Sequence, residues 1–306
     1  MSDGEVDGVP DLRADRGPLT RIRLGVAYDG TGFRGWTRQP GLRTVQGELE
    51  AALATLFRRQ SPAPVLTVAG RTDAGVHAVG QVAHLDLDEA QFSALTQVRA
   101  PRPGADVGEL LRRRINGILG ASSDVVVSSA GPAPDGFDAR FGAVWRRYRY
   151  RIADSVEARD PLQRHRTIWH PTALDEAALS EASAAVVGLN DFAAFCKPRE
   201  GATTIRTLQD FAWHRDADGV LIASLQADAF CHSMVRSLVG AAVAVGEGRL
   251  SLDALTGLLK ADARSSSFIV MPAKGLTLME VGYPDDAELA ARAGQTRQRR
   301  LSTELL

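Results

Sequence analysis

The chain alternates strand-like and helix-like segments, and some of its strand-like segments are joined by very short turns. Alternating patterns predict strands at 208–214 and 220–227, with Asp218 and Gly219 in the connection between them. Such a short connection makes two strands antiparallel neighbours, because a parallel pair needs a long crossover. Apolar stripes with helical spacing lie between the strands, for example at 44–57. The sequence therefore predicts an α+β fold with antiparallel sheets rather than a doubly wound parallel sheet.

The ends of the chain differ from its middle in composition. Residues 1–19 show no periodicity and are predicted to be a disordered N-terminal arm. The polar residues 285–306 are predicted to be a flexible tail, either a loose segment or a frayed helix. A length of 306 residues suggests about two domains. We expect an N-terminal α+β half at 20–135 and a C-terminal α+β half at 136–284, with an exposed loop at 97–107.

Composition excludes several classes of protein. No apolar run approaches the roughly 18 residues of a membrane helix, and the N-terminus lacks the apolar core of a secretory signal. Cys196 and Cys231 are too few for a disulfide framework or a four-cysteine zinc site, so we expect free thiols in a cytoplasmic protein. The net charge of −1 excludes a strongly basic protein but allows a local basic groove.

A glycine-rich segment, Gly30-Thr-Gly-Phe-Arg-Gly35, fits the G-x-G-x-x-G pattern of dinucleotide-binding proteins. That pattern requires a helix directly after the glycines, so that the helix N-terminus meets the pyrophosphate. Here Pro40 and Gly41 interrupt the chain, and the helix is expected only from Thr44. We favour a turn whose Trp36 either stacks on bases or anchors the loop; a nucleotide-dependent enzyme remains an alternative.

The segment at 68–78, VAGRTDAGVHA, combines a strand with a turn that presents charged side chains. Glycines at 70 and 75 allow close approach of a ligand, and Arg71 and Asp73 lie between them. Taken alone, an aspartate in such a turn most often stabilises the turn itself. The alternative is a catalytic carboxylate.

The string GRTDAGVHA resembles the catalytic motif of the tRNA pseudouridine synthase A family. Four more blocks resemble that family in the same order: YDGTGFRGW, FDARFGAVWRRYRYRI, AFCHSMVRSLVGAAVAVGEG and PAKGLTLMEVGYP. Together the blocks span about residues 21–283. The resemblance implies two ferredoxin-like halves around a central basic cleft, and a homodimer. It also implies an isomerase that converts uridine to pseudouridine at positions 38–40 of the tRNA anticodon stem-loop.

The resemblance assigns roles to individual residues. Asp73 matches the catalytic nucleophile, and Arg236 matches the basic residue that pairs with it. Arg71 matches an arginine that flips the target nucleotide. Tyr148 matches a catalytic tyrosine that stacks on the uracil and serves in later proton removal. A tRNA-contacting segment is implied at Phe137, Ala139, Arg140 and Phe141. Asp138 departs from the pattern, because relatives commonly carry histidine there.

These residue types suit the implied reaction. Pseudouridine formation breaks the bond from uracil nitrogen to ribose and remakes it to carbon 5, without redox change or group donor, so we expect no cofactor. A carboxylate nucleophile is required, and a neighbouring guanidinium favours its charged form. His77 and His84 match no metal-ligand spacing and are interpreted as structural, so no metal is expected. A noncatalytic RNA-binding protein on the same scaffold is the alternative, and the presence of both Asp73 and Arg236 favours the enzyme.

Overall fold

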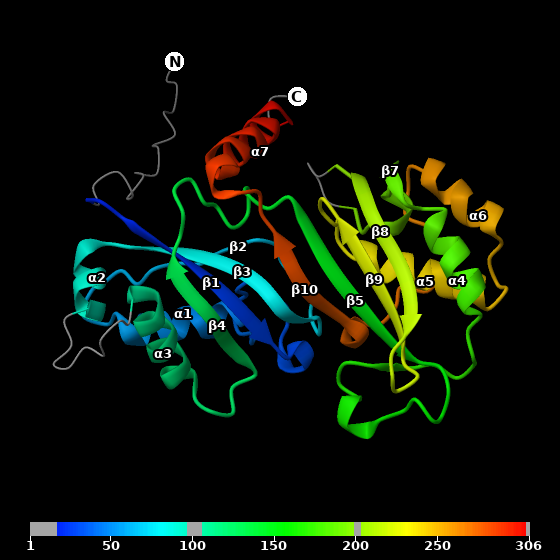
Figure 1. Cartoon of the computed structure of the whole chain (residues 1–306), viewed down its shortest axis with the longest axis horizontal. Helices are drawn as coiled ribbons and strands as arrows, with labels where there is room; N and C mark the ends of the chain where they lie inside the picture. The colour runs from blue at the N-terminus through cyan, green and yellow to red at the C-terminus, as the bar shows by residue number, and fades with distance from the viewer. Residues whose placement is uncertain (1–16, 97–105, 199–202, 304–306) are drawn as a thin grey trace, which may run out of the picture.

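One large sheet organises the computed structural model, which describes residues 17–96, 106–198 and 203–303 (Figure 1). The fold is mixed α+β, as predicted, and the ten strands are mostly antiparallel. The strands are β1 (Thr20–Tyr28), β2 (Thr67–Val68), β3 (His77–Leu87), β4 (Val125–Pro132), β5 (Trp145–Ala153), β6 (Ile168–Trp169), β7 (Gly188–Asp191), β8 (Ile205–Arg215), β9 (Leu221–Ala227) and β10 (Leu276–Gly282).

The last strand in the sequence lies in the middle of the sheet. The order is β4-β1-β3-β10-β5-β9-β8-β7, with β2 on β3 and β6 on β5. β10 runs parallel to β3, where Leu278 pairs with Ala78, and antiparallel to β5, where Leu278 pairs with Tyr148. The expectation of separate sheets is therefore corrected: β10 forms backbone hydrogen bonds on both sides and joins them into one.

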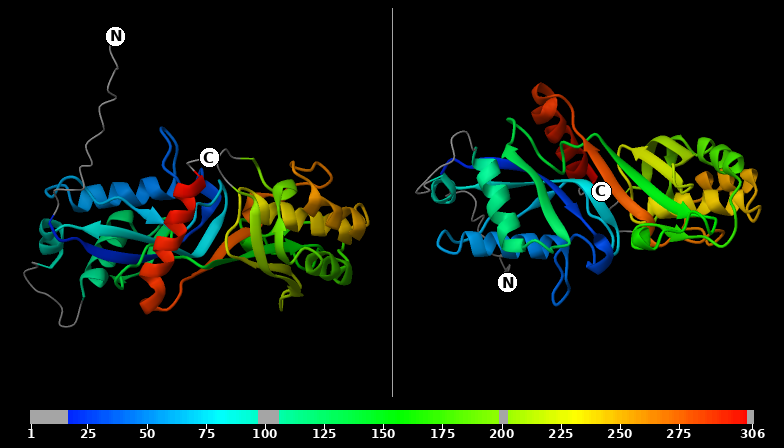
Figure 2. Two further views of the ribbon diagram at one scale, coloured as in Figure 1. Left: turned by 90° about the horizontal axis from the view of Figure 1, so that it is seen from above. Right: turned by 60° about the horizontal axis from the view of Figure 1, so that its bottom comes forward.

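The helices form two groups at opposite ends of the sheet (Figures 1 and 2). The first group is α1 (Val45–Leu56), α2 (Glu89–Thr96) and α3 (Val107–Leu119), and the second is α4 (Glu176–Ala184), α5 (Met234–Gly246) and α6 (Leu252–Gly257). α1 begins where the sequence predicts, because the Thr44 hydroxyl accepts a hydrogen bond from the backbone N–H of Gly47. Within the described residues, no helix is both long and apolar enough to cross a bilayer.

The C-terminal segment, expected to be a loose tail or a frayed helix, contains a helix, α7 (Leu289–Thr303). Leu289 and Ala293 are buried on one face of it, one helical turn apart. Gly136 allows the close approach: a side-chain carbon there would meet Ala290 at 2.5 Å. The expected N-terminal arm and the loop at 97–107 fall almost wholly outside the described residues; Asp106 caps α3.

The two cysteines are paired rather than free, which corrects the sequence-based expectation. Cys196 and Cys231 form a disulfide with their Cα atoms 5.8 Å apart. Cys196 follows a short 3-10 helix at Ala193–Phe195, and Cys231 lies just before α5. Two cysteines 35 positions apart give no sign in the sequence that the fold brings them together.

Candidate active site

Asp73 lies in the turn that connects β2 to β3. The backbone N–H of Trp36 donates to the carbonyl of Thr72 (3.1 Å), and the N–H of Gly75 donates to the carbonyl of Phe33 (3.2 Å). Gly75 has a φ of +79°, a conformation that favours glycine. The turn is therefore held from both sides of Asp73 by the glycine-rich loop at 30–36.

That glycine-rich loop packs against the Asp73 turn. A side-chain carbon at Gly30 would meet the carbonyl oxygen of Val76 at 2.0 Å, so only glycine fits. The backbone N–H of Gly30 donates to His77 Nδ1 (3.0 Å). Trp36 is buried to 1% exposure, which makes it an anchor of the loop rather than an exposed platform for bases.

Both oxygens of the Asp73 carboxylate face a basic side chain. Oδ2 lies 3.3 Å from Arg236 Nη2, and Oδ1 lies 3.4 Å from His232 Nε2. The Asp73 side chain keeps 32% of its surface exposed. Long contacts and partial exposure leave the carboxylate oriented and accessible to a substrate.

Arg236 projects from the first turn of α5 into the same region. Its Nη1 donates to the carbonyl of Met271 (3.3 Å), and its Nη2 also donates to the hydroxyl of Ser233 (3.2 Å). Carbonyl and hydroxyl groups carry no charge to balance the guanidinium. Asp73 is thus the one carboxylate that pairs with Arg236 among the described residues.

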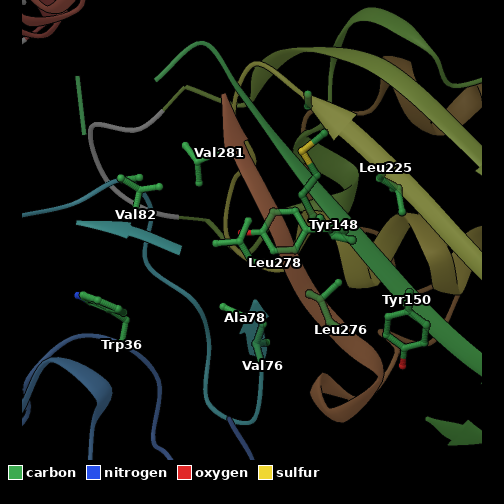
Figure 3. Close-up of a cluster of buried hydrophobic side chains, with 14 of the residues drawn as sticks. Trp36, Val76, Ala78, Val82, Tyr148, Tyr150, Leu225, Leu276, Leu278 and Val281 are labelled. Atoms are coloured by element: carbon green, nitrogen blue, oxygen red, sulfur yellow. The ribbon is translucent and has the colours of Figure 1, made fainter. Parts of the chain in front are cut away.

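Tyr148 places an aromatic ring beside this carboxylate. It lies on β5 next to Leu278 of β10, in a cluster of buried apolar side chains (Figure 3). Its ring meets Phe230 edge-to-face, with the centroids 5.2 Å apart. Burial raises the pKa of the Tyr148 hydroxyl far above its usual value, so the hydroxyl stays protonated at neutral pH.

A pocket of about 790 Å³ contains these groups. Its lining comes from both sides of β10 in the sheet: the Asp73 turn before β3 on one side, and β5 and the start of α5 on the other. Among the described lining residues Asp73 is the one carboxylate, and it is surrounded by basic side chains: Arg34, Arg71, Arg140, Arg146, Lys197, Arg206, His232 and Arg236. A local basic pocket is therefore present although the net charge of the chain is −1.

The residues expected at the site divide into two sets. Asp73, Arg236, Tyr148 and Arg71 line the same pocket, and the exposed Arg71 makes no hydrogen bond or ion pair to any described residue. In the expected tRNA-contacting segment, Arg140 lines the pocket and packs over the ring of its neighbour, Phe141.

Phe137 and Ala139, from the same segment, lie in the core instead. Phe137 is 1% exposed and packs on Tyr283, and Ala139 is fully buried. The backbone N–H of Ala139 donates to His84 Nδ1 (3.0 Å). Asp138 is buried as well, and its Oδ1 accepts hydrogen bonds from the N–H groups of Arg140 and Phe141. This carboxylate shapes the turn and presents no acid to the pocket.

Sequence reasoning missed several residues of the pocket. His232 precedes Arg236 by four positions, but Ser233 interrupts helical geometry between them, so the spacing alone does not place both side chains at Asp73. Arg146 precedes Tyr148 by two positions and so shares its face of the strand. Arg146 Nη1 donates to the carbonyl of Asp228 (2.6 Å) and Nη2 to that of Ala69 (3.1 Å). Burial lowers the pKa of the Arg146 guanidinium.

The histidines considered as metal ligands bond to the backbone. His77 Nε2 lies within hydrogen-bond distance of the carbonyls of His165 and Lys274. Across the part of the chain that the structure describes, no group of three or more His, Cys, Asp or Glu residues is arranged to hold a metal ion.

The chain is similar to known proteins over most of its length. A family model described as tRNA pseudouridine synthase matches residues 182–284. Whole proteins are similar to nearly the whole chain. The tRNA pseudouridine synthase A of Leifsonia xyli subsp. xyli is 60% identical to it over 278 residues, which cover 91% of this chain and 96% of that protein. The proteins of the same name from Streptomyces griseus subsp. griseus and Mycobacterium leprae are 53% and 49% identical, covering 91% and 92% of this chain and 93% and 96% of theirs. The chain belongs to the tRNA pseudouridine synthase A family.

Proposed function

We propose that this chain isomerises uridine to pseudouridine in tRNA, at positions 38–40 of the anticodon stem-loop. One observation carries the proposal: Asp73, the one carboxylate among the described lining residues of a basic pocket, contacts Arg236 and is partly exposed. The names of the relatives supply the substrate class, and the resemblance of the sequence motifs supplies the positions.

Asp73 acts as the nucleophile of the reaction. Attack on the ribose releases the uracil, whereas attack on uracil carbon 6 keeps the base attached to the enzyme; both routes need an ionised carboxylate with a free lone pair. The contacts of 3.3 and 3.4 Å to Arg236 and His232 leave lone pairs free on both oxygens. Uracil carbon 5 then forms the new bond to ribose carbon 1′. In the first route this bond displaces the Asp73 carboxylate from the ribose; in the second, the bond from Asp73 to carbon 6 breaks as carbon 5 loses its proton. The proton from carbon 5 leaves to solvent and N1 takes one up, so the formula of the nucleotide is unchanged.

Arg236, Arg71 and Tyr148 serve this nucleophile in different ways. Arg236 places a positive charge beside the carboxylate and orients it in the pocket. Arg71 is exposed and without a described partner, so it is available to fill the space that the flipped nucleotide leaves in the RNA. The ring of Tyr148 stacks on the uracil, a contribution of about 1–3 kcal/mol for an aromatic–base contact.

The basic lining of the pocket binds the phosphates of the tRNA. Arg140 contacts the RNA directly, and Phe141 supports the Arg140 guanidinium by packing beneath it. Phe137 and Ala139 hold the same segment in the core and act on tRNA binding only through Arg140.

The same family assignment supports a larger architecture. Residues 20–135 and 136–284 form two ferredoxin-like halves joined through β10, with the pocket as the cleft between them. The active protein is a cytoplasmic homodimer.

Mapping of pseudouridine in tRNA tests the proposed function. Incubation of unmodified tRNA transcripts with the protein yields pseudouridine at positions 38–40, and Asp73→Asn yields none while tRNA affinity persists. Binding of tRNA by the wild type without any pseudouridine would reject the enzyme and favour the noncatalytic RNA-binding alternative.

A further inference from the structure

The turn that leads into α5 contains an unusual backbone conformation. Ser233 has φ 67° and ψ 2°, and no other non-glycine residue in the described ranges has a positive φ. The N–H of Met234 donates to the carbonyl of Cys231 (3.1 Å), which closes a four-residue turn with Ser233 in its third position. These dihedral angles match the third position of a type II turn, where glycine or asparagine is usual.

Ser233 does not act as an ordinary helix cap. A serine before a helix normally has extended backbone and accepts a hydrogen bond from an N–H of the first turn. Ser251, before α6, does so: its φ is −79° and its hydroxyl accepts from the N–H of Ala254 (3.2 Å). Ser233 makes no such bond, and its hydroxyl accepts from Arg236 Nη2, the nitrogen that also donates to Asp73.

The same turn directs His232 to the other oxygen of Asp73. The disulfide of Cys231 holds the start of the turn, and the N–H of Lys197 donates to the carbonyl of His232 (2.9 Å). The backbone is fixed at these points, and the left-handed conformation of Ser233 changes its direction between His232 and Arg236. As a result the two side chains, though close in the sequence, contact different oxygens of the Asp73 carboxylate. Backbone strain of this kind persists where the surrounding structure enforces it, often at functional sites.

We propose that Ser233 is a positioning residue of the active site. Its left-handed backbone and its hydroxyl together place Arg236 and His232 on the two oxygens of Asp73. The inference rests on the proposed function, because its effect is measured as pseudouridine formation. Ser233 lies in one of the blocks that resemble the family, but the resemblance assigns it no role. The inference gives it one, and gives a reason for a non-glycine residue in this conformation.

Three variants separate the backbone from the hydroxyl. Ser233→Ala keeps the strain and removes the acceptor, so kcat falls about 5- to 10-fold, the effect of one hydrogen bond, while KM for tRNA changes less than about twofold. Ser233→Gly also removes the strain, so its Tm equals or exceeds that of the wild type although its kcat is as low. Ser233→Asn tolerates the left-handed backbone and offers a carbonyl to Arg236, so its kcat exceeds that of Ser233→Ala.

Ser251→Ala is the matched control, since it removes a cap hydroxyl from a residue that does not line the pocket. It lowers Tm and leaves kcat unchanged. Wild-type kcat in Ser233→Ala and Ser233→Gly would overturn the inference, and so would losses of kcat that merely follow losses of Tm across the Ser233 variants. Absence of pseudouridine with the wild-type protein would instead reject the proposed function, so the two failures are distinguishable.

Discussion

Two aspartate–arginine pairs in this molecule have opposite geometry. Arg215 holds Asp154 with two nitrogens, at 2.7 and 2.8 Å, and the Asp154 side chain is 1% exposed. Arg236 holds Asp73 with one nitrogen at 3.3 Å, and the Asp73 side chain is 32% exposed. Asp154 also accepts the N–H of Leu174 (2.9 Å), so its oxygens are occupied.

The difference separates a structural ion pair from the pair that we propose to be catalytic. A carboxylate held by two parallel hydrogen bonds is oriented but has little capacity left for a substrate. The pair of Asp73 and Arg236 lacks those two short contacts, and the Asp73 carboxylate stays accessible to a substrate. We therefore expect loss of Arg236 to affect turnover, and loss of Arg215 to affect stability.

The largest expected effect distinguishes the two arginines directly. Arg236→Gln lowers kcat by about 10²–10³-fold, because it removes the charge beside the nucleophile. KM for tRNA changes much less, since many other basic groups line the pocket. Arg215→Gln is the matched control: steady-state pseudouridine formation stays near the wild-type value while Tm falls. Equal losses of kcat in both variants would remove the distinction.

Asp154→Asn sharpens the structural side of the comparison. At neutral pH it lowers the free energy of unfolding by about 2 kcal/mol, less than for a fully buried pair because Arg215 reaches solvent. The hydrogen bonds from Arg215 lower the pKa of the Asp154 carboxyl in the folded protein. Its stabilising effect is therefore complete above the unfolded pKa of about 4 and is lost as the pH falls through the lower folded pKa.

Urea unfolding of wild type and Asp154→Asn at several pH values measures this effect. The gap in free energy of unfolding stays constant near neutral pH and narrows as the pH falls below the unfolded pKa of about 4. A gap that does not depend on pH would show that the ion pair is not its source.

Substitutions of two tyrosines on one face of β5, Tyr148 and Tyr150, are expected to have smaller effects, and of different kinds. Tyr148→Ala lowers kcat/KM by about 10- to 30-fold, because the uracil loses its stacking partner. Tyr150 donates its hydroxyl to the carbonyl of Pro272 (2.7 Å) and is buried in the core. Tyr150→Phe leaves kcat/KM unchanged and lowers the free energy of unfolding by about 1 kcal/mol. Single-turnover kinetics and urea unfolding of both variants measure these effects. A loss of kcat/KM in Tyr150→Phe, with none in Tyr148→Ala, would contradict the assignment.

The smallest expected effect concerns phosphate binding. Arg140→Gln weakens tRNA binding a few-fold and lowers the slope of log affinity against log salt concentration by about 1. Arg112→Gln is the control, because Arg112 pairs with Glu109 on α3 outside the pocket lining. An unchanged salt slope in Arg140→Gln would remove Arg140 from the tRNA-binding surface.

The sequence predicted local features well. The Thr44 cap, the antiparallel pair of β8 and β9 and the turn that presents Asp73 all depend on residues close together in the chain. The motif resemblance assigned Asp73, Arg236 and Tyr148 to one site, and these three residues line the same pocket.

Features that depend on distant contacts were not predictable in this way. The disulfide of Cys196 and Cys231 and the central place of β10 follow from the packing of remote segments. Phe137 and Ala139 were expected at the tRNA, but the sequence does not show that His84 and Tyr283 enclose them. The role of Ser233 depends on a dihedral angle that serine rarely adopts.

The most direct test of the account follows the hydrogen on carbon 5 of uridine. Pseudouridine formation replaces that hydrogen with the bond to ribose, so a tRNA with tritium on carbon 5 releases tritium to water as it reacts. We predict release with the wild-type protein and none with Asp73→Asn at saturating tRNA, although Asp73→Asn still binds the tRNA. Release by Asp73→Asn at the wild-type rate would show that Asp73 is not the nucleophile and would contradict the central claim.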